Sequence, residues 1–242
     1  MGFQYKQLGQ VTPGTNSPTL LYELPSSSYY AWIRQIHACN NSGNGNTTCR
    51  VFLDQDNNTA DETTALLWDV PVNDGGPMVL LEGAALPLLD LNGALQVRTA
   101  SAGDVTFTAF GMEYFPQDLD NGKIPFEFGQ VRPSVGGTAV NVTGAAGLNP
   151  IPAGYQGVIT DIIVTNTHAT DNTFLVVKYN AAAQTFALDT TAYVDELIKG
   201  TFFHYRGQLV GVNQTGALAV ECPLANAATF SIYGYLEPKR YI

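Results

Sequence analysis

The strongest constraint on the fold of this chain is an internal repeat that runs through most of its length. The segment Gly93–Val97 (GALQV) recurs as Gly216–Val220 (GALAV), 123 positions later. At the same offset, Val105–Gly111 (VTFTAFG) matches Ala228–Gly234 (ATFSIYG). A repeat of this length indicates two similar modules, each large enough to bury a core of its own.

The repeat extends toward the amino end of both halves. Gly9-Gln10-Val11 matches Gly129-Gln130-Val131, and an apolar run ending in Asn40 is matched by one ending in Asn166. The offset drifts by a few positions from block to block. Such drift places small insertions in loops, where they are tolerated. The order of the blocks therefore predicts an internal duplication.

The domain boundaries follow from the repeat. We predict one domain at residues 1–115 and a second at residues 129–242, in a chain of 242 residues. The join at residues 116–128 is rich in Pro, Asp and an Asn-Gly pair, which are turn formers. Phe126 and Phe128 should pin this short linker, so we expect limited domain movement.

Hydrophobic alternation indicates the fold class. Leu218, Val220 and Cys222 share one face of a strand, and Phe230 and Ile232 share one face of the next. This period of two is typical of half-buried antiparallel strands. We therefore expect an all-β protein made of two tandem antiparallel β-sandwich domains, jelly-roll or immunoglobulin-like, that arose by duplication. The best helix candidate is a short one, at Thr190–Lys199.

The last strand of each copy has an unusual second face. It carries apolar and aromatic side chains in both copies, at Phe110, Met112, Tyr114, Tyr233 and Tyr235. A strand face toward bulk water does not normally carry such a row. Either the core lies on that side, or the other domain or another subunit covers it. We take these five residues as the candidate interface.

The charge of the chain excludes some partners and favours self-association. The net charge is −10 and neither half has a basic stripe, so binding to nucleic acid is disfavoured. No apolar run is long enough to span a membrane, and the chain starts without the apolar segment of a signal peptide. Only 13% of residues are charged, which favours association into a homo-oligomer. Synthesis in the cytoplasm is expected.

Motifs for catalysis, metals and cofactors are weak. None of His37, His168 and His204 has a neighbour at the spacing of a zinc ligand pair. Asp54–Asn58 alternates acids and amides but lacks the Gly and Glu of an EF-hand loop, so a polar turn is the better interpretation. There is no nucleophile elbow and no phosphate-binding loop. We expect no catalytic, cofactor-binding or metal-binding residues, and a protein that is not an enzyme.

The three cysteines leave one local alternative open. Cys39 and Cys49 flank a Gly- and Asn-rich turn, so their thiols could face each other across a hairpin. Their counterparts in the second copy are Thr165 and Phe174 in our alignment, so the fold does not require a bridge. A cytoplasmic origin disfavours disulfides, and we expect free buried thiols.

The spacing of the apolar blocks in the first copy resembles that of β-sandwich structural proteins of tailed bacteriophage particles. The blocks that carry this resemblance are Leu21-Tyr22, Pro25, Ile33–Asn40, Arg50–Leu53, Trp68–Pro71, Gly93–Val97 and Val105–Gly111. The resemblance covers residues 9–114 and, more loosely, 129–238. The second copy departs from it where Tyr193-Val194-Asp195 replaces Trp68-Asp69-Val70.

The resemblance implies a virion structural protein, most specifically a capsid decoration or cement protein. Such a protein binds the major capsid protein lattice on the outer surface of the particle, often as a trimer. It would be made in the host cytoplasm and would raise capsid stability. A tail, collar or fibre component is the alternative within the same class. A tandem carbohydrate-binding module is the alternative from another class, and would use exposed Trp32, Trp68 or Tyr29 as stacking platforms.

Overall fold

The computed structural model describes residues 4–55, 60–115, 122–143, 148–180, 191–212 and 217–239. Within these ranges the chain forms sixteen β-strands and no α-helix. The strands make four four-stranded sheets, and all their pairings are antiparallel. The prediction of an all-β protein is confirmed.

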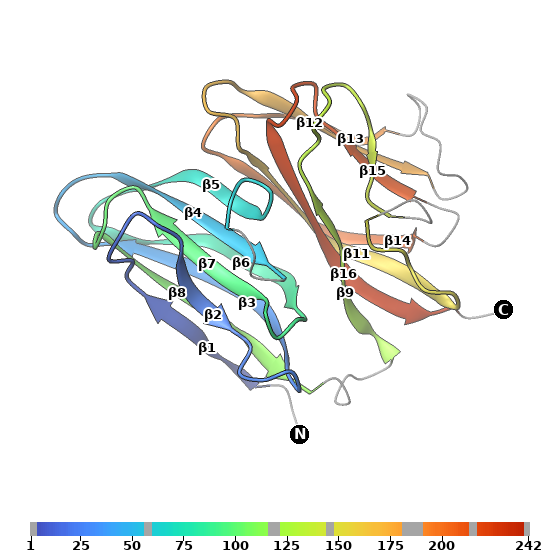
Figure 1. The fold of residues 1–242 in the computed structure, drawn as a ribbon, viewed down its shortest axis with the longest axis horizontal. Coiled ribbons are helices and arrows are strands. Elements are labelled where there is room, and N and C mark those ends of the chain that lie inside the picture. The colour runs from blue at the N-terminus through green and yellow to red at the C-terminus, as the bar shows by residue number, and fades with distance from the viewer. Residues whose placement is uncertain are drawn as a thin grey trace. The chain divides into compact units, whose positions relative to one another are not determined.

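The chain divides into two compact units, Met1–Leu119 and Asp120–Ile242. The first unit, blue to green in Figure 1, pairs its strands in the orders β1-β8-β3-β6 and β2-β7-β4-β5. Its strands are β1 (Gln4–Val11), β2 (Thr19–Glu23), β3 (Tyr30–Asn40), β4 (Thr47–Asp54), β5 (Ala65–Val72), β6 (Gly76–Leu88), β7 (Ala94–Thr99) and β8 (Val105–Tyr114).

The second unit repeats this strand order. Its sheets are β14-β11-β16-β9 and β10-β15-β12-β13, so each strand takes the place of the strand numbered eight lower. Its strands are β9 (Ile124–Val131), β10 (Val140–Asn141), β11 (Tyr155–Asn166), β12 (Thr173–Asn180), β13 (Thr191–Leu197), β14 (Phe202–Val212), β15 (Ala217–Glu221) and β16 (Ala228–Pro238). The repeat in sequence is thus also a repeat in topology.

Irregularities in the ladders recur at matching positions. The ladder between β3 and β8 shifts register between Ile33 and Gln35. The ladder between β11 and β16 shifts between Ile159 and Asp161, which are the corresponding residues of the second unit. A β-bulge is a specific feature that related folds keep. Its presence in both units supports a common origin.

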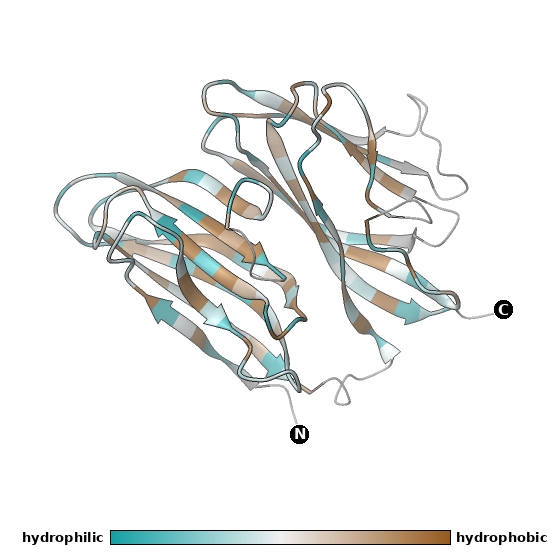
Figure 2. Ribbon diagram, viewed as in Figure 1, coloured by the Kyte–Doolittle hydropathy of each residue, from teal (hydrophilic) through white to brown (hydrophobic). Residues whose placement is uncertain are grey.

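Each unit is held together by apolar side chains that alternate along its strands. In the second unit, Phe230 and Ile232 from one sheet form a single core with Leu175, Val177 and Leu218 from the other. The bands of contrasting hydropathy along strands in Figure 2 show the same alternation. The predicted inward faces of β15 and β16 are therefore correct. In the first unit the largest fully buried side chains include Phe107, Ile36 and Leu53.

The helix predicted at Thr190–Lys199 is wrong. Thr191–Leu197 forms β13, which pairs with β12 along its length. The segment contains Thr, Tyr and Val, which favour strands, and cross-strand pairing outweighs its weak helical pattern. Thr190 itself lies outside the described residues.

The predicted linker at residues 116–128 overlaps a strand. β9 begins at Ile124, and Phe128 is fully buried in the core, with Phe126 packed against that core. The second unit therefore starts earlier than the predicted residue 129. An aromatic pair at alternate positions marks the strand, whereas the turn residues at 116–121 lie outside the described part of the chain.

The cysteines do not face each other across a hairpin. β3 and β4 belong to different sheets, and both Cys39 and Cys49 are free. The register also corrects our alignment by one position. Val51 pairs with Val97 as Val177 pairs with Val220, so the counterpart of Cys49 is Leu175 and not Phe174. A slip of one residue moves a side chain to the other face, and Leu175 is buried whereas Phe174 is 48% exposed.

Candidate functional site

The candidate interface of the first unit lies on the sheet face that points away from its core. On β8, Phe107 and Ala109 are fully buried, whereas Phe110 and Met112, which follow them on the other face, are half-buried. Tyr114 on the same face is buried, at 3% exposure. The core therefore lies on the side opposite to the aromatic row, which excludes the alternative that the row itself faces the core.

Rings from neighbouring strands extend this row into a surface. The ring of Tyr5 on β1 stacks parallel to Phe110, with centroids 6.4 Å apart, and His37 on β3 lies 5.2 Å from Phe110. The Tyr5 hydroxyl donates to Oε1 of Gln35 at 2.9 Å, and Tyr5 remains 52% exposed. We call the set Tyr5, Gln35, His37, Phe110 and Met112 the aromatic face. Aromatic side chains with polar neighbours are typical of protein interfaces.

Polar pairs border the aromatic face. Gln10 donates to the hydroxyl of Thr108 at 3.1 Å, and the hydroxyls of Thr12 and Thr106 lie 2.7 Å apart. Each of these side chains therefore has a partner within the sheet, although Gln10 and Thr12 remain exposed to water.

The second unit places its two candidate tyrosines differently. Tyr235 is half-buried, and the Lys123 ammonium lies 4.5 Å from its ring centroid. Tyr233, the counterpart of Phe110, is fully buried on the strand between Asp161 of β11 and Glu127 of β9. Burial raises the pKa of the Tyr233 hydroxyl well above its usual value, and the Glu127 carboxylate adds to the shift. Tyr235 is thus the accessible ring of this pair.

The histidines occupy three different settings. His204 Nε2 lies 2.8 Å from Oδ1 of Asp161, and both side chains are mostly buried. His168 Nδ1 accepts the backbone N–H of Thr170 and of Asp171, which fixes a loop. His37 belongs to the aromatic face. Among the described residues, no three His, Cys, Asp or Glu side chains gather as metal ligands would. Residues 56–59 of the acid and amide run lie outside that part of the chain.

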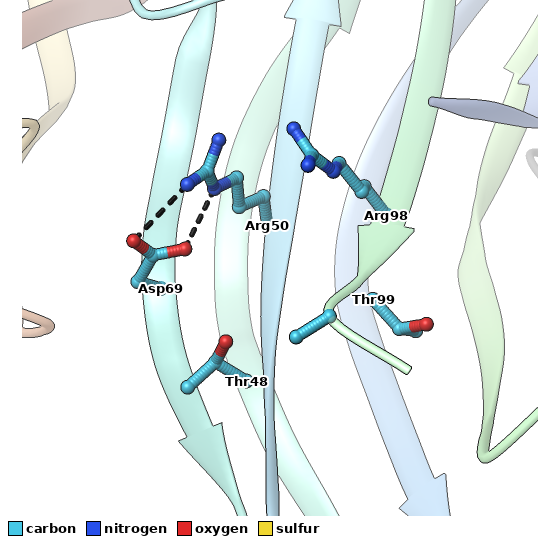
Figure 3. A pocket seen from close by; sticks show the side chains of 6 residues that line it. Thr48, Arg50, Asp69, Arg98 and Thr99 are labelled. Atoms are coloured by element: carbon cyan, nitrogen blue, oxygen red, sulfur yellow. Dashed lines mark hydrogen bonds and ion pairs between the residues drawn. The ribbon is translucent and has the colours of Figure 1, made fainter. Parts of the chain in front are cut away.

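A polar recess on the other sheet of the first unit was not found by the sequence reasoning. It is a cavity of about 50 Å³ lined by Thr48, Arg50, Asp69, Arg98, Thr99 and Ala100. Figure 3 shows the side chains of Arg50 and Arg98 extending next to each other, with Asp69 on the far side of Arg50. The two arginines are direct cross-strand partners on β4 and β7.

A β-bulge builds one wall of this recess. The β4–β5 ladder pairs Cys49 with Val70 and Val51 with Leu67, so both Trp68 and Asp69 face Arg50. Asp69 takes a φ of 50°, in the left-handed region that Asp tolerates better than most residues. The extra residue therefore brings a ring and a carboxylate to the same guanidinium.

Arg50 is fixed on two sides as a result. Its Nε and Nη2 atoms donate to the two carboxylate oxygens of Asp69, at 2.7 and 3.1 Å. Its guanidinium carbon lies 3.4 Å from the ring centroid of Trp68. A two-point carboxylate contact combined with stacking on an aromatic ring is the geometry that arginine, and not lysine, provides.

The contact between Arg50 and Trp68 also tests whether the aromatic rings proposed for sugar stacking are open to a ligand. Trp68 is 6% exposed and one of its ring faces is occupied by Arg50. Trp32 is half-buried and lies 5.3 Å from the ring of Tyr114, and Tyr29 lies 4.4 Å from the ring of Phe115. A stacking platform needs an open ring face, so Trp68 does not serve as one.

Comparisons with known proteins identify no family. No family model matches the chain, and no curated protein matches it. Among solved structures, the chain is similar to the tandem CBM22-1–CBM22-2 domain of Paenibacillus barcinonensis Xyn10C, with 8% identity, 96% of this chain and 86% of that one covered, and a TM-score of 0.28. It is also similar to a chain of broad bean stain virus, with 8% identity, coverages of 96% and 89%, and a TM-score of 0.36.

A third similarity is to a chain of the T13 particle of infectious bursal disease virus, with 11% identity, coverages of 98% and 69%, and a TM-score of 0.30. At such scores none of these likenesses assigns a function.

The described part of the chain also contains no helix that is long and apolar enough to cross a membrane.

Proposed function

We propose that this chain is a non-catalytic structural component of a virus particle, built as two tandem jelly-roll sandwiches that arose by duplication. The observation that carries the proposal is the strand order 1-8-3-6 and 2-7-4-5, present in both units. Jelly rolls have eight strands in two sheets and are a common architecture of capsid domains. An immunoglobulin-like sandwich has seven to nine strands in a different order, so the jelly roll is the better description.

The more specific proposal is capsid decoration. The protein would sit on the outer surface of the particle, bind the major capsid protein lattice, and associate with itself as a trimer. The aromatic face of the first unit and Tyr235 of the second would supply contacts. Each contact is small, but many copies on a regular lattice bind more tightly than one copy alone. The net charge of −10 suits a position away from packaged nucleic acid.

The direct test is binding to capsids from which such proteins have been stripped. The purified chain should bind the expanded lattice and raise its resistance to heating, and should bind isolated capsid subunits poorly. The double variant Tyr5→Ser, Phe110→Ser should weaken lattice binding with little change in its own unfolding midpoint. Leu20→Ser is a matched control because Leu20 is an exposed apolar residue, 43% accessible, outside the aromatic face.

Several results would change the assignment. Closed shells formed by the chain alone would make it the shell protein and contradict decoration. Attachment to tails instead of capsids would favour a tail, collar or fibre component. Retention on a host polysaccharide column, with no binding to particles, would overturn the virion proposal in favour of carbohydrate binding. Light scattering that shows only monomer at tens of micromolar, roughly the range of weak contacts, would contradict the trimer.

A further inference from the structure

The recess between Arg50 and Arg98 holds more positive charge than its own residues neutralise. Asp69 pairs with Arg50 through both carboxylate oxygens. The side chain of Arg98 makes no ion pair or hydrogen bond with any other described residue, and Arg98 lies directly opposite Arg50 in the ladder. Like charges that face each other across a strand pair destabilise a sheet. The folded protein keeps this arrangement, which points to a ligand that offsets it.

The second unit shows that the fold does not need this cluster. The position of Arg50 is occupied by Val176 and that of Arg98 by Glu221, since these two residues pair in the same ladder. Val176 faces Val194 on its other side, where Arg50 faces Trp68 and Asp69. The same strands therefore pair without arginines, without the bulge at this point and without an acid in the place of Asp69. The cluster is a feature of one copy alone.

The charge and size of the recess limit the ligand. Two guanidinium groups and one carboxylate leave a net charge of one positive unit, which a single monovalent anion balances. A cavity of about 50 Å³ accommodates one small group of a ligand. A planar carboxylate matches the fork of arginine donors, and Arg50 retains three N–H donors after its two bonds to Asp69. A phosphate with two negative charges would leave the recess with a net negative charge.

We propose that the recess formed by Thr48, Arg50 and Arg98 is a binding site for one carboxylate group. Arg98 supplies the free guanidinium, Arg50 is held in place by Asp69 and Trp68, and Thr48 lines the recess beside them. The carboxylate comes either from a small free acid or from an Asp or Glu side chain of another protein. This inference does not depend on a role in a virus particle.

The test follows the arginine Nε–H resonances of the full-length chain by NMR during titration with sodium acetate, at constant ionic strength set with sodium chloride. We expect saturable shifts of the Arg50 and Arg98 signals in the millimolar range. Arg98→Gln should weaken acetate binding at least about tenfold, because it removes the only unpaired guanidinium of the site. Arg98→Lys should restore binding only in part, since lysine lacks the planar fork. Arg34→Gln, a half-buried arginine on β3, should bind acetate as the parent does.

A thermal readout gives an independent check. Acetate should raise the unfolding temperature of the parent relative to chloride, by linkage of binding to folding. The rise should vanish in Arg98→Gln and persist in Arg34→Gln. In the absence of acetate, Arg98→Gln should melt no lower than the parent, because it relieves the repulsion with Arg50. A lower melting temperature would show that Arg98 stabilises the fold itself and would overturn the proposal.

Two further ligands test where the bound carboxylate comes from and whether the site prefers a carboxylate to a phosphate. N-acetylglutamic acid α-methylamide carries one side-chain carboxylate between peptide groups. If it binds as tightly as acetate, the natural source is a protein side chain; if it binds much more weakly, the source is a small free acid. Inorganic phosphate that shifts the two arginine signals at lower concentration than acetate would contradict the carboxylate assignment. No saturable shift with either carboxylate would remove the site.

Discussion

The side-chain amide of Asn40 donates to the carbonyl oxygen of Val72 at 3.3 Å, and so ties the end of β3 to the end of β5 in the other sheet. The same amide donates to the carbonyl of Gly45 at 2.9 Å. Asn166 repeats this in the second unit, where its amide donates to the carbonyls of Leu197 at 2.9 Å and Asp171 at 3.0 Å. Both asparagines are fully buried. In each unit, the side-chain amide of one buried asparagine therefore links the two sheets.

Removing either amide should destabilise its own unit. Asn40→Ala leaves the carbonyls of Val72 and Gly45 without their side-chain donor, and Asn166→Ala does the same in the second unit. An unsatisfied buried polar group costs about 1–3 kcal/mol, so we expect a loss of about 2–3 kcal/mol in each variant. Urea unfolding followed by fluorescence and circular dichroism measures this loss.

The exposed Asn16 provides the control for both variants. Asn16→Ala should change the free energy of unfolding by less than about 0.5 kcal/mol, as for most surface substitutions. If Asn40→Ala were equally silent, the amide would not connect the sheets in solution.

Two equivalent glycines should tolerate no side chain. A Cβ added at Gly111 would lie 2.0 Å from the carbonyl oxygen of Trp32, and one at Gly234 would lie 2.0 Å from that of Val158. Backbone cannot move aside without breaking the ladder, so Gly111→Ala and Gly234→Ala should each cost at least about 3 kcal/mol. At Gly14 nothing lies within 4 Å of the added atom, and Gly14→Ala should be close to neutral in thermal unfolding.

The stability of the first unit should fall in alkali because of Cys49. Burial raises the pKa of the Cys49 thiol to about 12, and the nearby Asp69 carboxylate adds to the shift. An unfolded cysteine titrates at about 8.5, so above that pH the unfolded chain has lost a proton that the folded chain keeps. Stability is then full below about pH 8.5 and declines as the pH rises toward 12.

The slope in this window should be about 1 kcal/mol per pH unit, and Cys49→Ala should remove it. Urea unfolding at pH 8.5, 9.0 and 9.5, chosen below the range of roughly 10 where tyrosines titrate, isolates the thiol. Burial also raises the pKa of Tyr22, Tyr114 and Tyr233, so these add to the decline only at higher pH. Equal slopes in the parent and Cys49→Ala would show that the thiol is open to solvent.

The two units should fold separately. Each has two sheets and a core of its own, so residues 1–119 and 120–242 expressed alone should both give strand-type circular dichroism and cooperative unfolding. Cutting at 120 leaves β9 complete, whereas starting at 129 would remove Phe128 from the core and should give an aggregating product. Random-coil spectra from both halves would mean that the units depend on each other to fold.

The internal repeat and the strand alternation could be predicted because they are properties of local pattern. A period of two survives in any sequence whose strands bury one face, and the matches around Gly93 and Gly216 kept their spacing. The helix predicted at Thr190–Lys199 was wrong because this short segment has no clear preference for helix or strand. Pairing with the neighbouring strand β12 therefore determines its secondary structure. Whether Cys39 and Cys49 face each other could not be decided from sequence, because their strands are consecutive in the chain but lie in different sheets.

The recess at Arg50 could not be predicted for a related reason. Arg50, Asp69 and Arg98 are far apart in sequence and meet only through the β4–β5 and β4–β7 ladders. Trp68-Asp69 stood out as a departure between the copies, yet the bulge that turns both residues toward Arg50 depends on pairing. Alternation alone would have placed Trp68 and Asp69 on opposite faces.

A bulge of one residue at Trp68–Asp69 lets a single strand show two successive side chains to the same side, while the inward residues Val70 and Val72 keep their places. The second unit keeps the same strand order without a bulge at the corresponding pair, Val176 and Val194. The outer surface of one unit therefore carries a charged recess, while the pairs on either side of the bulge, Cys49 with Val70 and Val51 with Leu67, remain in place.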